Sequence, residues 1–213
     1  MNNTQKIIEI LEKEIPVAKS ELNFENNFQL LCAVILSAQC TDKRVNQVTP
    51  QLFQVAPTPQ KMMEIPLEQL EQLIHSCGFY HHKAVFLRDA SKDIVEKFSG
   101  VVPNTLEDLM SLKGVGRKTA NVVYAVGFNG QAIAVDTHVF RVANRLGLAS
   151  AKTVEKTEEQ LMQVLPRERW SNCHHLLLLH GRYTCKSQKP KCNDCSLTKY
   201  CKHFKQRENQ DVY

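Results

Sequence analysis

The stretch Leu112-Lys113-Gly114-Val115-Gly116-Arg117-Lys118 lies between two segments with helical periodicity. Glycines on either side of one apolar residue permit a tight turn that ends at the start of the next helix. The unpaired N–H groups and the dipole at a helix start favour an anion such as a DNA phosphate. We therefore expect Gly114 and Gly116 to contact DNA and Val115 to anchor the turn by burial. A plain helix–helix connection with a glycine C-cap is the alternative.

Helical patterns extend from this turn in both directions. The expected helices span 5–11, 28–36, 43–55, 67–76, 83–98, 106–111, 117–126, 138–146, 154–164 and 168–180, with Gly and Pro between them. Residues 28–36 are apolar nearly all round and predict a buried central helix. The fold class is therefore all-α. The best break in composition is 128–130, before a short extended run at 131–135.

Composition sets the broad class. The chain has 213 residues, 27 Lys+Arg, 22 Asp+Glu and a net charge of +5. Its longest apolar runs are too short to span a membrane, and the N-terminal residues do not resemble a signal peptide, so we expect a cytoplasmic protein with no membrane partner. In a reducing compartment its eight cysteines favour metal binding or reactivity over disulfides.

Four cysteines cluster near the C-terminus. Cys185, Cys192, Cys195 and Cys201 have the spacing C-x6-C-x2-C-x5-C. Thiols at this density predict a four-thiolate metal site. Zinc sites with four cysteines usually pair two C-x2-C knuckles, and only one is present, whereas an iron–sulfur cubane accepts a single compact loop. The spacing leaves both metals open.

The sequence also offers a nucleophile and a carboxylate. Lys118 begins the helix after the glycine turn, and an unprotonated lysine amine can form a Schiff base with a sugar carbon. Such an amine needs a cleft that disfavours its charged form. Asp136 could stabilise the positive charge that develops when an N-glycosidic bond breaks. A solvated surface lysine and a helix N-cap aspartate are the plain alternatives.

The glycine turn resembles a helix-hairpin-helix motif, although Lys113 replaces the usual Pro. Two further blocks are Val-Asp136-Thr-His138-Val-Phe-Arg and His180-Gly-Arg-Tyr-Thr-Cys185. Together with Leu36-Ser37-Ala38-Gln39 and Gly78-Phe79-Tyr80, they resemble the endonuclease III family of DNA glycosylases over nearly the whole chain.

The resemblance implies a two-domain all-α fold with a helix-hairpin-helix motif, a C-terminal [4Fe-4S] loop and an active cleft between the domains. One domain, residues 20–130, carries the hairpin. The other is discontinuous, 1–19 plus 131–213, and holds the [4Fe-4S] cluster through the four clustered cysteines.

Roles carry over position by position. Lys118 matches the Schiff-base nucleophile and Asp136 the catalytic carboxylate. Gln39 matches the residue that fills the gap left by the flipped base. Phe79 matches the wedge at the opposite strand, where many relatives have Leu. His138 matches a family position with either a structural hydrogen-bonding or a catalytic role.

The implied function is base excision repair by a bifunctional DNA N-glycosylase and AP lyase, acting as a monomer on oxidised or ring-saturated pyrimidines in duplex DNA or on abasic sites. Lys118 argues against a monofunctional mismatch glycosylase of the same fold, which has a hydroxyl residue there. A non-catalytic DNA-binding iron–sulfur damage sensor is the other alternative, and it would need neither Lys118 nor Asp136.

The positive charge is local. Residues 182–207 hold eight basic side chains and one acid, a charge of +7 that leaves −2 for the rest. Within the first inter-cysteine loop, we expect Lys189 and Lys191 to face DNA phosphates. A solvated lysine-rich loop is the alternative.

Overall fold

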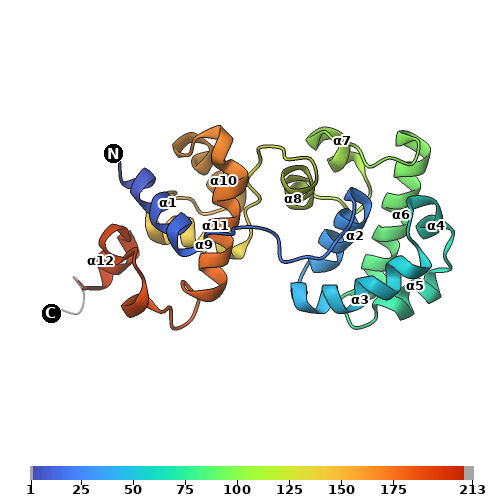
Figure 1. Cartoon of the computed structure of the whole chain (residues 1–213), viewed down its shortest axis with the longest axis horizontal. Coiled ribbons are helices and arrows are strands. Elements are labelled where there is room, and N and C mark those ends of the chain that lie inside the picture. The colour runs from blue at the N-terminus through green and yellow to red at the C-terminus, as the bar shows by residue number, and fades with distance from the viewer. Residues whose placement is uncertain (1, 209–213) are drawn as a thin grey trace. The chain divides into compact units, whose positions relative to one another are not determined.

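The structure is a computed structural model that describes residues 2–208, and every regular element in that range is helical (Figure 1). This confirms the all-α prediction. No helix within the described residues is long and apolar enough to cross a membrane.

The chain divides into two compact units. One, here called the hairpin unit, is Glu21–Gly130. The other, the cysteine unit, comprises the described parts of Met1–Ser20 and Gln131–Tyr213. The chain therefore enters the cysteine unit at its N-terminus, leaves it for the hairpin unit, and returns.

The hairpin unit is built around α2 (Asn27–Ser37), whose residues from Phe28 to Leu36 are all buried. Asn26 caps this helix, and its side chain accepts a hydrogen bond from the backbone N–H of Gln29. Helix α2 contacts α3, α6 and α8. The other helices are α3 (Asp42–Val55), α4 (Pro59–Glu64), α5 (Leu67–Ile74), α6 (Tyr80–Phe98), α7 (Leu106–Ser111) and α8 (Arg117–Gly127). The prediction of a buried central helix is confirmed.

The cysteine unit packs α9 (Thr137–Leu146) against α11 (Trp170–Tyr183). Gly181 makes this close approach possible, because a Cβ there would lie 2.9 Å from the Cβ of His138. Helix α1 buries Ile7, Ile8 and Leu11 and contacts α11. The remaining elements are α1 (Asn3–Glu14), α10 (Val154–Val164), η1 (Arg167–Arg169), η2 (Cys192–Asp194), η3 (Thr198–Tyr200) and α12 (Lys202–Glu208).

Two helices differ from the sequence expectation. Helix α4 is not expected from the sequence, because Pro57, Pro59 and Pro66 suggest a loop. Pro59 nevertheless occupies the first turn, where it lacks no helical hydrogen bond, and Thr58 caps the helix. Helix α12 after the last cysteine was also not expected. Residues 131–135 form no strand, although Ala132, Ile133, Ala134 and Val135 are buried.

Candidate functional site

The glycine hairpin joins α7 to α8. Gly114 has a φ of 75°, in the left-handed region that favours glycine, and a Cβ there would lie 2.5 Å from Cγ of Phe86. Val115 is 6% exposed, which confirms that it anchors the turn. Gly116 is the N-cap of α8, and no side chain caps that helix. Gly114 and Gly116 are exposed.

Lys113 occupies the position where the helix-hairpin-helix motif usually has proline. Its backbone N–H donates a hydrogen bond to Oδ2 of Asp93 at 2.9 Å, which a proline could not do. Asp93 lies on α6, is 5% exposed, and also pairs with Lys97 at 2.8 Å. Burial opposes ionisation, but the hydrogen bonds and charges of Lys97 and Lys113 hold the pKa of the Asp93 carboxyl below its ordinary value. The hairpin is thus fastened to α6.

Lys118 lies in the first turn of α8, two residues after Gly116, and its side chain is exposed. The cleft that the sequence predicts around this amine remains a prediction.

Asp136 is the N-cap of α9 in the cysteine unit. Its Oδ1 accepts hydrogen bonds from the backbone N–H groups of His138 and Val139, both at 2.8 Å. The cap confirms that interpretation of the residue, and it also fixes the orientation of the carboxylate. Because both bonds go to Oδ1, capping does not engage Oδ2. The nearby His138 accepts a hydrogen bond at Nδ1 from Arg141 at 3.2 Å.

Gln39 and Phe79 occupy two turns of the hairpin unit, one between α2 and α3 and one before α6. Both are exposed and both have positive φ, 52° and 59°. For residues other than glycine this conformation is strained. The turns lie side by side, because a Cβ on Gly78 would be 3.5 Å from the carbonyl oxygen of Gln39. Phe79, 61% exposed, is among the large apolar side chains left in solvent.

Helix α6 supports the glycine hairpin, the Gln39 turn and the Phe79 turn. The residues of α6 that do so were not predicted from the sequence. Lys83 is 4% exposed, and its Nζ donates to the carbonyl oxygen of Leu36 at 2.9 Å. This bond satisfies the C-terminal end of α2, directly before the Gln39 turn. Phe86 packs on Gly114, and Asp93 holds Lys113. The partners of Lys83 and Asp93 lie 47 and 20 residues away in sequence, so no local pattern marks them.

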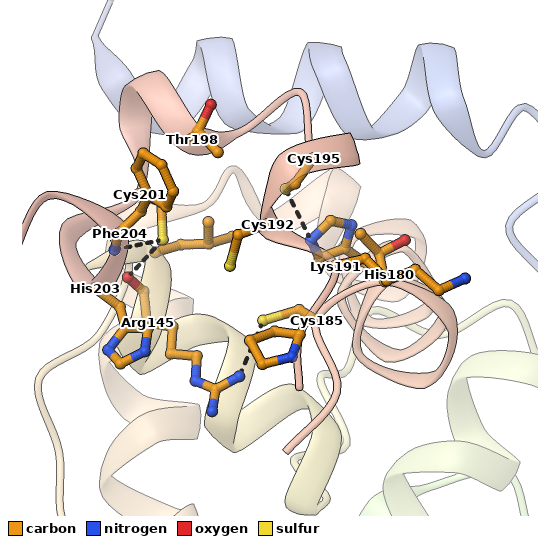
Figure 2. A pocket seen from close by; sticks show the side chains of 13 residues that line it. Arg145, His180, Cys185, Lys191, Cys192, Cys195, Thr198, Cys201, His203 and Phe204 are labelled. Carbon is orange, nitrogen blue, oxygen red and sulfur yellow. Dashed lines mark hydrogen bonds between the residues drawn. The ribbon is translucent and has the colours of Figure 1, made fainter. Parts of the chain in front are cut away.

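The four clustered cysteines line one pocket in the cysteine unit (Figure 2). Their side chains come from the segment directly after α11, from η2 and from the segments on either side of η3, and they are drawn around a common space. Leu146, Pro190 and Phe204 supply apolar lining. No group of three or more metal-binding side chains within the described residues is arranged to hold a single metal ion.

Arg145 of α9 joins this pocket to the loop between Cys185 and Cys192. Its NH1 donates to Cys185 Sγ at 3.5 Å and to the carbonyl oxygen of Lys186 at 2.7 Å. Its NH2 donates to the carbonyl oxygen of Ser187 at 3.1 Å. The backbone N–H of Phe204 donates to Cys201 Sγ at 3.5 Å. Sulfur atoms that accept N–H hydrogen bonds suit thiolate ligands.

The same loop carries the basic side chains. Lys189 and Lys191 are exposed, and Lys189 has a φ of 48°. The backbone N–H of Lys191 donates to the carbonyl oxygen of Thr184 at 3.0 Å. The backbone at Lys191 is therefore held in place while both lysine side chains remain exposed.

Comparison with known proteins places this arrangement in a family. The HhH-GPD superfamily of base excision DNA repair proteins matches residues 32–167. Endonuclease III of Haemophilus influenzae (strain ATCC 51907 / DSM 11121 / KW20 / Rd) is 45% identical over 95% of this chain and 97% of its own length. Endonuclease III of Escherichia coli (strain K12) is 45% identical over 99% of this chain and 100% of its own length. A solved trapped endonuclease III–DNA covalent intermediate superposes with a TM-score of 0.92 at 44% identity, covering 98% of this chain and 99% of that one.

The helical fold and its hairpin thus define a DNA glycosylase of the helix-hairpin-helix class. The chain belongs to the endonuclease III family within the HhH-GPD superfamily. It is a base excision repair enzyme with DNA glycosylase and AP-lyase activity.

Proposed function

We propose that this enzyme excises oxidised or ring-saturated pyrimidines from duplex DNA and then cleaves the strand through a Schiff base on Lys118. The observation that carries the proposal is an exposed lysine in the first turn of α8. This helix follows the glycine hairpin and has no side-chain cap, so the N–H groups at its start suit a DNA phosphate. The relative solved as a trapped covalent intermediate with DNA supports a covalent route.

In this mechanism, the damaged nucleotide leaves the base stack, which costs least for a lesion that already stacks poorly. Phe79 enters the duplex as an apolar wedge, and Gln39 fills the space of the flipped base. The exposed, constrained positions of both side chains on adjacent turns support these roles. The hairpin holds the backbone phosphate beside Lys118.

Lys118 Nζ attacks C1′, and the bond from C1′ to the base breaks. The capped orientation of Asp136 suits it to stabilise the positive charge that develops on the sugar. The resulting Schiff base acidifies the C2′ proton. Loss of that proton expels the 3′ phosphate by β-elimination and breaks the strand.

We propose that Cys185, Cys192, Cys195 and Cys201 hold a [4Fe-4S] cluster. Four thiols around one pocket match the donor set, and the N–H groups of Arg145 and Phe204 already point at two of the sulfurs. Burial raises the pKa of the Cys195 and Cys201 thiols, so these ligands need a positively charged metal core to stay deprotonated. When bound, the cluster supplies a cross-link that fixes the basic loop.

We further propose that the enzyme acts as a monomer in the cytoplasm. The described chain contains eight free cysteines, which suits a reducing compartment.

The test is cleavage of defined duplexes by the purified protein in EDTA, which inactivates contaminating nucleases that require a divalent metal. We expect nicking of an abasic duplex, excision of a ring-saturated pyrimidine, and no excision of adenine from a mismatch. Lys118→Gln should bind the abasic duplex without nicking it. Adenine excision without strand cleavage would indicate the mismatch glycosylase instead. Binding without either reaction would indicate the damage sensor. Visible absorption with four irons and four sulfides per chain, as the proposed cluster contains, distinguishes it from zinc.

A further inference from the structure

Two cysteines outside the cluster flank the DNA-facing turns of the hairpin unit. Cys40 follows Gln39, and Cys77 precedes Gly78 and Phe79. Each closes a turn through its own backbone: the N–H of Cys40 donates to Ser37, and the N–H of Cys77 donates to Ile74, at 3.1 and 2.8 Å. The cysteines are therefore fixed points of the two turns, and not side chains on mobile segments.

The two cysteines are neighbours. Cys77 is fully buried and Cys40 is half-buried, and the Cys40 thiol contributes to the raised pKa of Cys77. The backbones approach as well, since a Cβ on Gly78 would be 3.5 Å from the carbonyl oxygen of Gln39. Cys40 is thus the more exposed residue of the pair, and Cys77 is buried.

Two cations act on the pair. The ammonium group of Lys83 is held against the Leu36 carbonyl, and the charge of Arg44 also acts on the Cys77 thiol. Burial raises the pKa of the Cys77 thiol to about 11, and Cys40 acts in the same direction, while Lys83 and Arg44 oppose the shift. Oxidation therefore begins at the more accessible Cys40, with Cys77 as the second thiol.

We propose that Cys40 and Cys77 form a reversible disulfide that joins the two DNA-contacting turns and lowers the activity of the oxidised enzyme. The effect on activity rests on the proposed DNA-contact roles of Gln39 and Phe79. With a small-molecule disulfide as oxidant, the Cys40 thiolate attacks one sulfur and releases a thiolate. The Cys77 sulfur then displaces the second thiolate from the mixed disulfide. The two cysteines lose two electrons and two protons, and the oxidant becomes two thiols.

The cross-link restrains the turns. A disulfide brings two sulfurs to about 2.05 Å. The two turns lie side by side, because a Cβ on Gly78 would be 3.5 Å from the carbonyl oxygen of Gln39. Gln39 and Phe79 sit on those turns at positive φ. A covalent link between the turns therefore holds both side chains in one relative arrangement and opposes the adjustment that entry into the duplex requires.

The experiment uses the cluster-loaded enzyme, reduced and desalted, then incubated with oxidised glutathione. This oxidant is chosen because peroxide also attacks iron–sulfur clusters, and visible absorbance is followed to show that the cluster is intact. Free thiols are alkylated, and peptides are mapped by mass spectrometry. The rate constant for nicking an abasic duplex is measured before oxidation, after it, and after a dithiol reductant.

We expect a Cys40–Cys77 linked peptide, a nicking rate at least threefold lower, and full recovery on reduction. Cys40→Ser and Cys77→Ser, each compared with its own reduced form, should show neither the link nor the loss. Cys173→Ser is the matched control, because Cys173 is buried in the cysteine unit and no thiol acts on its pKa, and it should behave as wild type.

Two results would overturn the proposal. One is the absence of the linked peptide while Cys40 is fully converted to its glutathione mixed disulfide. The other is a fully linked enzyme that nicks at the reduced rate. If the reduced enzyme does not nick DNA at all, the proposed function has failed, and the linked peptide still reports separately on the disulfide.

Discussion

The carboxylate of Asp93 accepts a hydrogen bond from the backbone N–H of Lys113 at 2.9 Å and fastens the glycine hairpin to α6. A proline at position 113 has no N–H to donate, so this hydrogen bond to the buried aspartate requires a residue other than proline there. The position of the hairpin therefore depends on Asp93, which lies 20 residues before Lys113 in the sequence.

Asp93→Ala should destabilise the protein by about 1.5–3 kcal/mol, the usual worth of hydrogen bonds to a charged group. Because the pKa of Asp93 is lowered in the folded protein, its contribution is complete above the unfolded-state value near 4 and is lost as the pH falls through the lower folded value. Urea unfolding should show a constant difference from pH 8 to pH 5 and a shrinking one only below about pH 4.

Two controls sharpen this test. Glu96→Gln removes an exposed carboxylate from the same helix and should leave stability nearly unchanged. Lys113→Pro should cost less in the Asp93→Ala background than in wild type, because its N–H has then already lost its partner. A difference that shrinks between pH 7 and pH 5, or additive effects in the double variant, would show that this bond is not the link.

Phe79→Ala should weaken binding to a lesion duplex by about 1–3 kcal/mol, the range for one aromatic–base stack. Phe79→Leu should retain most of the affinity, because an apolar wedge remains. Titration of a labelled duplex by fluorescence anisotropy measures both. Val101→Ala, which trims another exposed apolar side chain of the hairpin unit, should bind as wild type. Equal binding by Phe79→Ala and wild type would remove Phe79 from the interface.

Replacing Lys189 and Lys191 by Gln should weaken DNA binding and flatten its salt dependence. Each lost phosphate contact reduces the slope of log K against log salt by about 0.9, so the double variant should lose up to about 1.8. The single-turnover rate in the saturated complex should not change. Lys152→Gln, an exposed lysine outside the loop, is the control. An unaltered slope would favour a merely solvated loop.

Arg145→Leu should loosen the cysteine pocket, because it removes one hydrogen bond to Cys185 Sγ and two to the loop backbone. Changes of this kind typically cost about 10- to 100-fold in metal affinity. The rate of iron transfer to a chelator should therefore rise, while Arg167→Leu, an exposed arginine of the same unit, should match wild type. Unchanged iron release would show that Arg145 does not support the metal site.

Local patterns predicted the buried α2, the burial of Val115 and the cap formed by Asp136, because periodicity, glycine and capping residues act within a few positions of themselves. The supports of the site could not be read in this way. Lys83 and Asp93 act on Leu36 and Lys113, which become neighbours only after α6 has packed. Helix α4 was missed because proline is compatible with a first helical turn as well as with a loop.

The family and its enzymatic class follow from the motifs and from the relatives, whereas the roles of single residues remain predictions. Lys118 is exposed, as the alternative interpretation of a surface lysine expects, and its role as the nucleophile remains a prediction.

Borohydride trapping tests the role of Lys118 most directly. Wild type mixed with an abasic duplex and borohydride should give a covalent protein–DNA adduct, and peptide mapping should find the reduced sugar on Lys118. Lys118→Gln should bind the same duplex and give no adduct. An adduct formed by Lys118→Gln at the wild-type rate, or one mapped to another amine in wild type, would contradict the account.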